Sequence, residues 1–300
     1  MKHHFPRIYQ DRFALLGLDI EKFYHTRIRK CFRLQGQEID MNTHLFDPVL
    51  WYPENAYFFE KKDDDLIKKL FQEGKLYIQD AASLIAPLVL APDAHHRVLD
   101  CCAAPGTKTL HLSYLMGQQG ELVANESYRS RFYRLSSNLK RFGGGHVSAL
   151  NYDARYLTKI FEEASFDRIL LDAPCSGEGM VTKIHKVLKM WNVKRIRKLS
   201  KLQKQLLESA YHLLKPDGVL VYSTCTLAPE ENEQVVQHLL ISHPSAKINP
   251  ISIKGLQTRP GISMWKDQEY IKEIELAMRI YPEDYGTNGF FIAEIHKKST

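Results

Sequence analysis

Short apolar runs and helix-like segments alternate along the chain between about residue 77 and residue 245. Five of the runs are rich in Val, Ile and Leu, and nearly continuous apolar runs of this kind are typical of strands buried on both faces. The predicted strands are 97–101, 121–125, 146–150 and the runs that end at Asp172 and Thr224. The predicted helices between them are 107–116, a basic segment that ends at 141–143, and 199–214. This alternation predicts a parallel sheet with right-handed crossovers.

The first part of the chain has a different pattern. It holds helical patches, a basic strand candidate at 27–34 and a turn-prone stretch at 51–55. We therefore expect a small N-terminal α+β module over residues 1–75. Residues 76–300 are expected to form an α/β domain with a Rossmann-like sheet, mostly parallel and twisted, with helices on both faces. A last strand is predicted at 288–295.

The composition places the chain in an ordinary class. Of the 300 residues, 44% are apolar and 25% are charged, as in typical globular proteins. The sequence has no run of about 18 apolar residues, so we expect no membrane span. The basic start lacks the apolar stretch of a secretory signal. The five cysteines are odd in number and include the adjacent Cys101 and Cys102, which favours reduced thiols in the cytoplasm. No His/Cys spacing indicates a metal site.

The turn after the first predicted strand, residues 102–108, has the character of a ligand-binding loop. Its small residues and Gly106 let the backbone approach a ligand, and the helix that follows offers unpaired N–H groups. The turn is neither G-x-G-x-x-G nor a Walker P-loop. Glu126 follows the second strand and Asp153 the third, positions suited to ribose hydroxyls and an adenine amino group. Together these residues predict a pocket for an adenosine-bearing ligand, and both NAD and S-adenosylmethionine fit it.

Two cysteines follow the fourth and fifth predicted strands, Cys175 in D-A-P-C-S-G and Cys225 in S-T-C-T. Each alone is also explained as a small buried apolar residue. Their matched strand-end positions, with Asp172 beside them, favour nucleophilic chemistry in the crevice where open α/β sheets bind ligands. A thiolate that adds to carbon 6 of cytosine makes carbon 5 able to attack a methyl sulfonium. An acid near ring nitrogen 3 stabilises the developing charge, and a second thiol assists the later elimination.

These residues resemble the RsmB/Nop/Sun family of RNA cytosine-5 methyltransferases, and the segment 175–181 is closest to the bacterial ribosomal RsmF type. The similarity covers about residues 75–297, and the paired D-A-P-C-S-G and S-T-C-T motifs make it specific. The matching segments, in chain order, are 77–83, 100–109, 134–143, 172–179, 222–226, 229–233, 279–282 and 289–293.

The resemblance implies a class I methyltransferase fold, S-adenosylmethionine as cofactor and RNA as substrate. It implies that Cys225 is the covalent nucleophile and that Cys175 helps to release the methylated RNA. It implies further that Asp172 contacts the cytosine and borders the cofactor, and that Lys108 reaches toward the target base. The residues implied to hold the cofactor are Cys102, Ala103, Ala104, Pro105, Gly106, Thr107, Lys108, Glu126, Asp153 and Asp172.

Two positions depart from the family pattern. Thr107 replaces a common glycine in the cofactor loop, and Glu283 follows Tyr281-Pro282 where many members have histidine. Two rival functions also stay open at this point. One is an RNA-binding or ribosome-assembly factor without activity, which the retained thiols disfavour. The other is a dinucleotide-dependent oxidoreductase, which the missing G-x-G-x-x-G disfavours.

Residues 183–204 carry nine lysines or arginines and no acid. Such a run is often a solvated helix face, but its place after the catalytic loop predicts a contact with an RNA backbone. His185 and Trp191 within it are candidates for stacking on an unpaired base, and burial of Trp191 is an equal alternative. A second predicted RNA contact comprises Arg27, Arg29, Lys30 and Arg33. We expect ribosomal RNA rather than transfer RNA as substrate, and a monomer as the default state.

Overall fold

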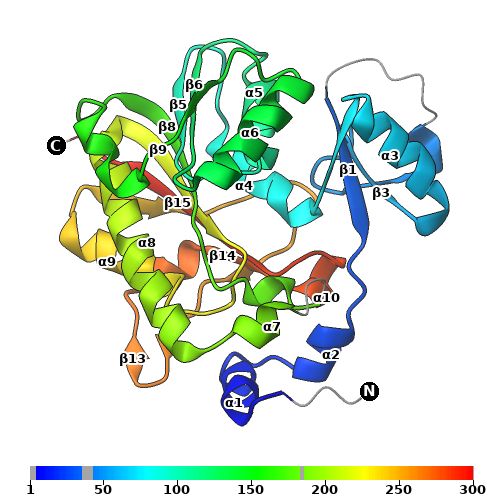
Figure 1. The fold of residues 1–300 in the computed structure, drawn as a ribbon. Coiled ribbons are helices and arrows are strands. Elements are labelled where there is room, and N and C mark those ends of the chain that lie inside the picture. The colour runs from blue at the N-terminus through cyan, green and yellow to red at the C-terminus, as the bar shows by residue number, and fades with distance from the viewer. Residues whose placement is uncertain (1–4, 36–42, 183–185, 300) are drawn as a thin grey trace.

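The computed structural model describes residues 5–35, 43–182 and 186–299 (Figure 1). Lys183 and His185 of the basic stretch therefore lie outside the described residues. Within the described ranges, no helix combines the length and the apolar character needed to cross a membrane. The described chain forms a large sheet, a small N-terminal sheet and a short hairpin.

The large sheet has the strand order β11-β14-β15-β9-β8-β5-β6-β7, with β10 paired to β15. Neighbours from β9 to β7 in this order are parallel, whereas β15 runs antiparallel to β9. The predicted α/β, mostly parallel Rossmann-like sheet is thus confirmed. The strand bounds are β5 Arg97–Asp100, β6 Glu121–Asn125, β7 Ser148–Leu150, β8 Phe166–Asp172, β9 Leu214–Thr224, β10 Ala246–Asn249, β11 Arg259–Pro260, β14 Met278–Ile280 and β15 Phe290–Lys297.

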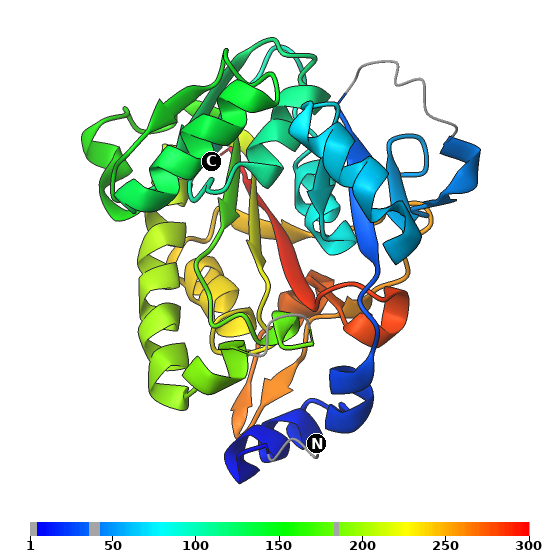
Figure 2. The same cartoon turned by 45° about the vertical axis from the view of Figure 1, so that its right-hand side comes forward.

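Helices cover both faces of this sheet because its strands are apolar on both sides. Successive strand residues point to opposite faces, so Val98 packs into one core and Leu99 into the other. Figures 1 and 2 show the two helical layers on either side of the strands. The first layer contains α4 Ile85–Leu90, α5 Thr107–Leu115 and α6 Arg129–Arg141. The second contains η4 Ala154–Lys159, α8 Val193–Leu213 and α9 Glu233–Ser242.

The small sheet has the order β2-β3-β1-β4 and packs on α3. Phe32, Phe59 and Ile67 lie in the core between this sheet and helix. Its last strand lies just beyond the predicted module boundary at residue 75, and that boundary stays a prediction. The element bounds are β1 Lys30–Leu34, η1 Thr43–Leu45, β2 Asp47–Pro48, β3 Ala56–Phe59, η2 Lys61–Asp63, α3 Asp64–Gln72, β4 Leu76–Gln79 and η3 Ala81–Leu84.

The two N-terminal helices are α1 Arg7–Leu15 and α2 Ile20–His25. They precede β1 and lie beyond its N-terminal end, away from α3 and the other strands of the small sheet (Figure 1). They pack beside α7 Lys186–Met190, where Tyr9 meets the Trp191 ring edge-on at a centroid distance of 4.8 Å. Arg12 donates hydrogen bonds of 2.8 and 2.7 Å to the Glu230 carboxylate. These contacts attach α1 and α2 to the large domain.

Two motifs that the sequence analysis matched to the family, 229–233 and 279–282, meet in the structure. Arg279 of β14 donates from Nε and Nη2 to the two carboxylate oxygens of Glu233 in α9, both at 2.6 Å. Both side chains are almost fully buried. Because a buried charge is stable only when it is paired, this bidentate pair fixes the antiparallel edge of the sheet to α9. The remaining elements are η5 Glu178–Met180, β12 Met264–Trp265, β13 Gln268–Glu269, η6 Lys272–Leu276 and α10 Pro282–Tyr285.

Candidate active site

The two predicted thiols face each other beyond the carboxyl ends of β8 and β9. These strands are parallel neighbours, and Asp172 lies opposite Ser223 in their register. The chain continues in the same direction from both strands, which brings Cys175 Sγ to 3.2 Å from Cys225 Sγ. The hydrogen bond to Cys225, together with burial, raises the pKa of the Cys175 thiol well above its usual value. The two sulfurs are thus within hydrogen-bond distance, and either thiol can be the donor.

Asp172 joins this thiol pair to the first helix of the sheet. Its Oδ2 accepts a hydrogen bond of 2.7 Å from Lys108 Nζ, and its Oδ1 accepts one of 2.9 Å from Ser223 Oγ. Burial alone would lower the pKa of Lys108, but the ion pair with Asp172 outweighs it, so the net shift is upward. Lys108 is thus a cation, and its Nζ lies 5.3 Å from the centre of the Phe290 ring. All four predicted catalytic residues gather at this edge of the sheet.

A buried carboxylate holds the two cysteine loops together. Glu231 Oε2 accepts hydrogen bonds of 2.9 Å from the Ser176 N–H and from Gln203 Nε2 of α8. Gln203 Nε2 also donates to the Pro174 carbonyl at 2.9 Å. The two loops touch directly where Ser176 Oγ lies 2.7 Å from Thr226 Oγ1. Burial raises the pKa of Glu231 to about 7.

A pocket opens next to the thiols at the carboxyl end of β5. The predicted loop supplies most of its wall, together with Lys108 and Asp172. Gly106 begins α5 with a φ of +109°, and a side chain there would press on Leu135 Cδ1 at 3.2 Å, so glycine is required at this turn. The lining residues are Gln79, Asp80, Ser83, Asp100, Cys102, Ala103, Ala104, Pro105, Thr107, Lys108 and Asp172.

Four of these residues, Gln79, Asp80, Ser83 and Asp100, were missed by the sequence reasoning. Asp100 is fully buried, burial raises its pKa to about 7, and only its Oδ2 is bonded, to the Thr109 hydroxyl at 2.7 Å. Its Oδ1 and both amide atoms of Gln79 are buried without a hydrogen-bond partner among the described residues. Buried polar atoms are normally satisfied, so these orphan groups fit a polar ligand such as the implied cofactor. All four residues lie in the segments 77–83 and 100–109 that match the family, and this match could have identified them.

Glu126 and Asp153 lie at the neighbouring strand ends but do not line this pocket. Glu126 is buried, accepts a 2.9 Å hydrogen bond from the Tyr128 N–H and lies 3.1 Å from Arg131 Nη1. Asp153 begins η4 and pairs with Arg155 at 2.6 Å. Their predicted contact with the cofactor stays a prediction.

The two departures from the family pattern have simple local partners. Thr107 lines the pocket and donates a hydrogen bond of 3.3 Å to Tyr77 Oη, so its side chain is accommodated in the loop. Glu283 accepts one of 3.2 Å from Arg259. Arg259 also bonds Asp284 at 2.7 Å, and the three residues connect β11 to α10.

Two predicted RNA-facing side chains are buried. The prediction for Arg33 is wrong, because the side chain is 0% exposed and lies 5.7 Å from the Tyr114 ring. Burial lowers the pKa of Arg33 to about 10. For Trp191 the burial alternative holds, since it is 9% exposed and donates a 2.5 Å hydrogen bond to Glu178 Oε1.

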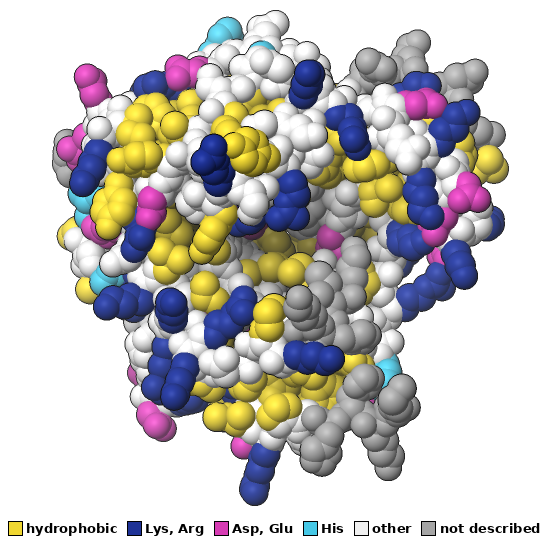
Figure 3. Space-filling model, in the orientation of Figure 1, with side chains coloured by type: hydrophobic (Ala, Val, Ile, Leu, Met, Phe, Trp, Pro, Cys, Tyr) yellow, Lys and Arg dark blue, Asp and Glu magenta, His cyan; other side chains and the backbone are white. Residues whose placement is uncertain are grey.

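The other N-terminal cations are on the surface, but each already has an acidic partner. Arg29 Nη2 lies 2.6 Å from Asp47, whereas Arg27 and Lys30 pair with Glu60 and Asp64. The lysines and arginines of α8 differ, because none of them forms an ion pair with a described residue. Figure 3 shows dark blue side chains spread over the face where α7 and α8 lie in Figure 1. Among the described lysines and arginines of this face, the exposed ones are Lys189, Lys194, Arg197, Lys198 and Lys201, and the partly exposed ones are Arg195 and Lys204.

A Rossmann-like sheet with a pocket at its β5 turn, and with a carboxylate and two thiols at the neighbouring strand ends, defines a nucleic-acid cytosine-5 methyltransferase. Such enzymes are dependent on S-adenosylmethionine. The chain belongs to the 16S rRNA methyltransferase RsmB/F family, which it matches over residues 87–296. The sequence-based expectation of fold, cofactor and enzyme class is confirmed.

Individual relatives agree with this assignment. The chain is 37% identical to the tRNA (cytosine(49)-C(5))-methyltransferase of Pyrococcus abyssi over 252 residues, covering 84% of the chain and 80% of that enzyme. It is 40% identical to the ribosomal RNA small subunit methyltransferase F of Vibrio vulnificus over 284 residues, covering 90% of the chain but only 58% of that protein. A solved methyltransferase homologue from Pyrococcus horikoshii superposes with a TM-score of 0.83 at 30% identity, covering 98% of the chain and 95% of the homologue.

Proposed function

We propose that this chain transfers a methyl group from S-adenosylmethionine to carbon 5 of a cytosine in RNA through a covalent adduct with Cys225. The observation that carries the proposal is the 3.2 Å approach of Cys225 to Cys175 beside the Asp172–Lys108 ion pair. A retained pair of thiols with an acid at hand is expected of an active enzyme. An assembly factor without activity would not need this geometry.

The two thiols take different roles in the proposed reaction. Cys225 Sγ adds to carbon 6 of the cytosine, and the bound cofactor supplies an electrophilic methyl group to carbon 5. The raised pKa keeps Cys175 protonated before the reaction, so it is not the attacking nucleophile. In the elimination Cys175 gives its proton to the departing Cys225 sulfur as the carbon–sulfur bond breaks, and the Cys175 thiolate so formed accepts the proton lost from carbon 5.

The ion pair is proposed to orient the base. Asp172, held by Ser223 and Lys108, faces ring nitrogen 3, and the Lys108 cation stabilises the charge that develops on the ring. The loop 102–108 and Asp172, with Gln79 and Asp100, would hold the cofactor. We retain Glu126 and Asp153 as further cofactor contacts that require local rearrangement of their present partners.

The RNA is proposed to lie across the face of α7 and α8. The lysines and arginines of α8 form no ion pair with a described residue, whereas Arg27, Arg29 and Lys30 would have to exchange an acidic partner for a phosphate. We accordingly divide the chain into an RNA-binding module at 1–75 and a catalytic domain at 76–300. The target base must be unpaired or extruded to reach the thiols.

We propose ribosomal RNA as the substrate class, because the segment 175–181 resembles the ribosomal RsmF type. The transfer-RNA enzyme of Pyrococcus abyssi makes transfer RNA the second candidate. We propose a cytoplasmic location, in keeping with the odd number of five cysteines, and a monomer as the default state.

The test is methyl transfer from labelled S-adenosylmethionine to undermethylated total RNA. Wild type is expected to label carbon 5 of cytosine, and the size of the labelled RNA identifies its class. Cys225→Ala is expected to abolish transfer. Cys175→Ala is expected to accumulate a protein–RNA adduct, because release loses its proton carrier.

Cys31→Ala serves as the matched control, since Cys31 is a buried thiol in the small sheet. It is expected to leave the product and the adduct level unchanged. Tight RNA binding without any transfer, on free RNA and on ribosomal particles alike, would sink the proposal in favour of an assembly factor.

A further inference from the structure

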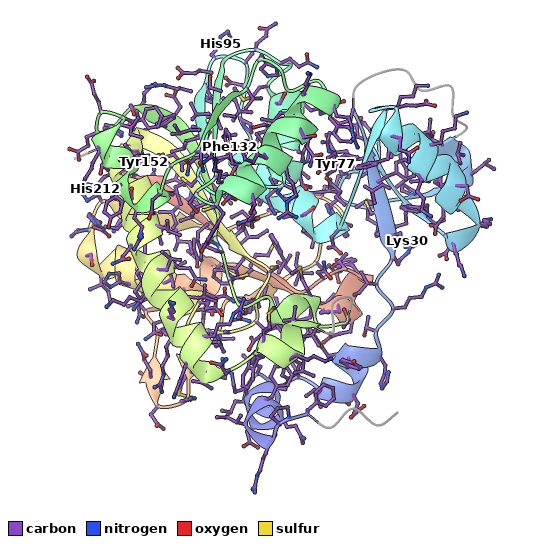
Figure 4. The ribbon with its side chains drawn as sticks, in the orientation of Figure 1. Lys30, Tyr77, His95, Phe132, Tyr152 and His212 are labelled. Atoms are coloured by element: carbon purple, nitrogen blue, oxygen red, sulfur yellow. The ribbon has the colours of Figure 1, made fainter. Side chains whose placement is uncertain are left out.

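Three metal-ligating side chains gather where α8 ends beside the end of α9. Glu208 and His212 are one turn apart on α8 and so share a face, and His243 is the residue that follows α9. One ligand atom from each lies within 4.8 Å of the others. In Figure 4, His212 lies at the edge of the molecule opposite Lys30 of the small sheet.

The distances are close to those of a metal centre. His243 Nε2 lies 2.5 Å and His212 Nε2 3.6 Å from the same oxygen, Glu208 Oε1. Ligand atoms around a tetrahedral Zn²⁺ are roughly 3.4 Å apart, as follows from bond lengths of about 2.0–2.1 Å. A metal therefore needs only small side-chain rotations, which open the contact between His243 Nε2 and Glu208 Oε1.

The cluster is also supported from outside, as metal ligands normally are. Glu163 Oε1 lies 3.6 Å from His212 Nδ1, slightly beyond hydrogen-bond distance, so a carboxylate faces the imidazole nitrogen that stays free when Nε2 binds a metal. The Tyr211 ring packs against the His243 ring at a centroid distance of 4.8 Å. The second oxygen of Glu208 is buried and has no hydrogen-bond partner among the described residues.

We propose that Glu208, His212 and His243 bind one Zn²⁺, which fastens the end of α8 to the end of α9. Two imidazoles and one carboxylate are a borderline donor set that suits zinc, and a water completes the tetrahedron. The site is independent of methyl transfer. Spacing did not reveal it, because His243 is far along the chain from the Glu208–His212 pair.

Zinc alone is the probe. Wild type is expected to bind one equivalent in competition with a chromogenic chelator and to melt at a higher temperature with zinc than without it. Glu208→Gln and His243→Ala are each expected to lose this equivalent and the melting shift. Glu163→Gln is expected to weaken binding roughly tenfold, because it removes only the outer carboxylate.

His238→Ala is the matched control, since this exposed histidine lies on α9 outside the cluster. It is expected to bind zinc like wild type. The paired thiols of the active site are the competing location, and Co²⁺ distinguishes the two, because only thiolate ligands give an intense sulfur-to-metal charge-transfer band. That band in the first-bound Co²⁺, or full zinc binding by Glu208→Gln and His243→Ala, would overturn the proposal.

Discussion

The Lys108–Asp172 ion pair decides how charge is arranged at the reacting edge of the sheet. The Lys108 side chain is 12% exposed and Asp172 30% exposed, so water screens their attraction only in part. The pair holds the Lys108 cation next to the thiols, where the proposed mechanism places the negative charge that accumulates on the base. An interaction of this kind is strongest in the transition state.

Lys108→Met is therefore expected to lower kcat for methyl transfer by about 100-fold, as does the loss of one preorganised charge-stabilising donor in other active sites. The stable fold is expected to remain, since methionine retains the apolar length of the lysine stem. Single-turnover rates with saturating RNA and cofactor are the measurement.

Lys140→Met is the matched control, because Lys140 is an exposed lysine on α6. Lys108→Arg is expected to recover only part of the rate, since a guanidinium keeps the charge but not the shape of an ammonium. Equal rates for Lys108→Met and wild type would remove Lys108 from the catalytic residues.

At the scale of single residues, the sequence could predict which side chains meet at the carboxyl ends of the strands. Cys175, Cys225 and Asp172 follow adjacent parallel strands, so their meeting follows from the topology. The burial of Arg33 could not be predicted. In β1, Cys31 packs into the core of the large domain and Phe32 into that of the small sheet, so both faces are covered. The basic pattern of this strand gave no sign of the second covering layer.

At the scale of elements, the catalytic loops depend on a junction between α8 and the turn after β9. Glu231 receives hydrogen bonds from Ser176 in one loop and from Gln203 in the helix. The junction is buried, and this is why the pKa of Glu231 is raised to about 7. A shift of this sign links the free energy of unfolding to pH.

Glu231→Gln is expected to flatten the pH dependence of stability between about pH 4.5 and pH 7. The folded protein holds the Glu231 proton more tightly than the unfolded chain does. The contribution of Glu231 to the free energy of unfolding is therefore complete below the unfolded pKa of about 4.3. It is lost as the pH rises through 7, by up to about 1.4 kcal/mol per pH unit. Urea unfolding at a series of pH values measures the slope.

Asp100 contributes a slope of the same sign, because burial also raises its pKa to about 7. In Glu231→Gln the slope of the free energy of unfolding against pH is therefore expected to be reduced and not abolished. Asp100→Asn is the companion variant that removes the Asp100 part of the slope. An unchanged slope in Glu231→Gln would show that this carboxyl is ionised in the folded state throughout the range.

The predicted strands of the parallel sheet correspond to observed strands because each apolar run is bounded by turn residues. The helix predicted at 199–214 begins earlier, at Val193, where Asn192 Oδ1 accepts a 2.8 Å hydrogen bond from the Arg195 N–H. The basic residues of its first turns concealed the apolar spacing. The short strand β14 was not predicted, since its pairing with β15 and its Arg279–Glu233 ion pair are tertiary contacts.

At the scale of the whole molecule, the distribution of charge matters more than the net charge of +6. The N-terminal cations near the small sheet are paired with acids, whereas no lysine or arginine of α8 forms an ion pair with a described residue. The unpaired cations lie on the elements that follow the Cys175 loop. In the proposed binding mode, RNA held on α8 delivers the target base to the thiols, which couples RNA affinity to methyl transfer.

Substitution of Lys194, Arg195 and Arg197 by alanine is expected to weaken RNA binding. Because each phosphate contact releases counterions, the slope of log affinity against log salt is expected to fall by about 2, close to 0.7 for each cation on single-stranded RNA. The measurement is filter binding of the RNA at several salt concentrations. Zinc binding by the triple variant is expected to be normal, since Glu208 and His212 lie at the other end of α8.

Two comparisons make this outcome specific. Alanine at Lys159, Lys247 and Lys254, three exposed lysines outside α7 and α8, removes the same charge and is expected to leave the salt slope near that of wild type. Arg33→Met is expected to bind RNA like wild type, because the Arg33 side chain is buried. If the α8 triple variant and the control triple variant lose affinity and slope equally, RNA binding depends on net charge alone and α8 holds no defined phosphate site.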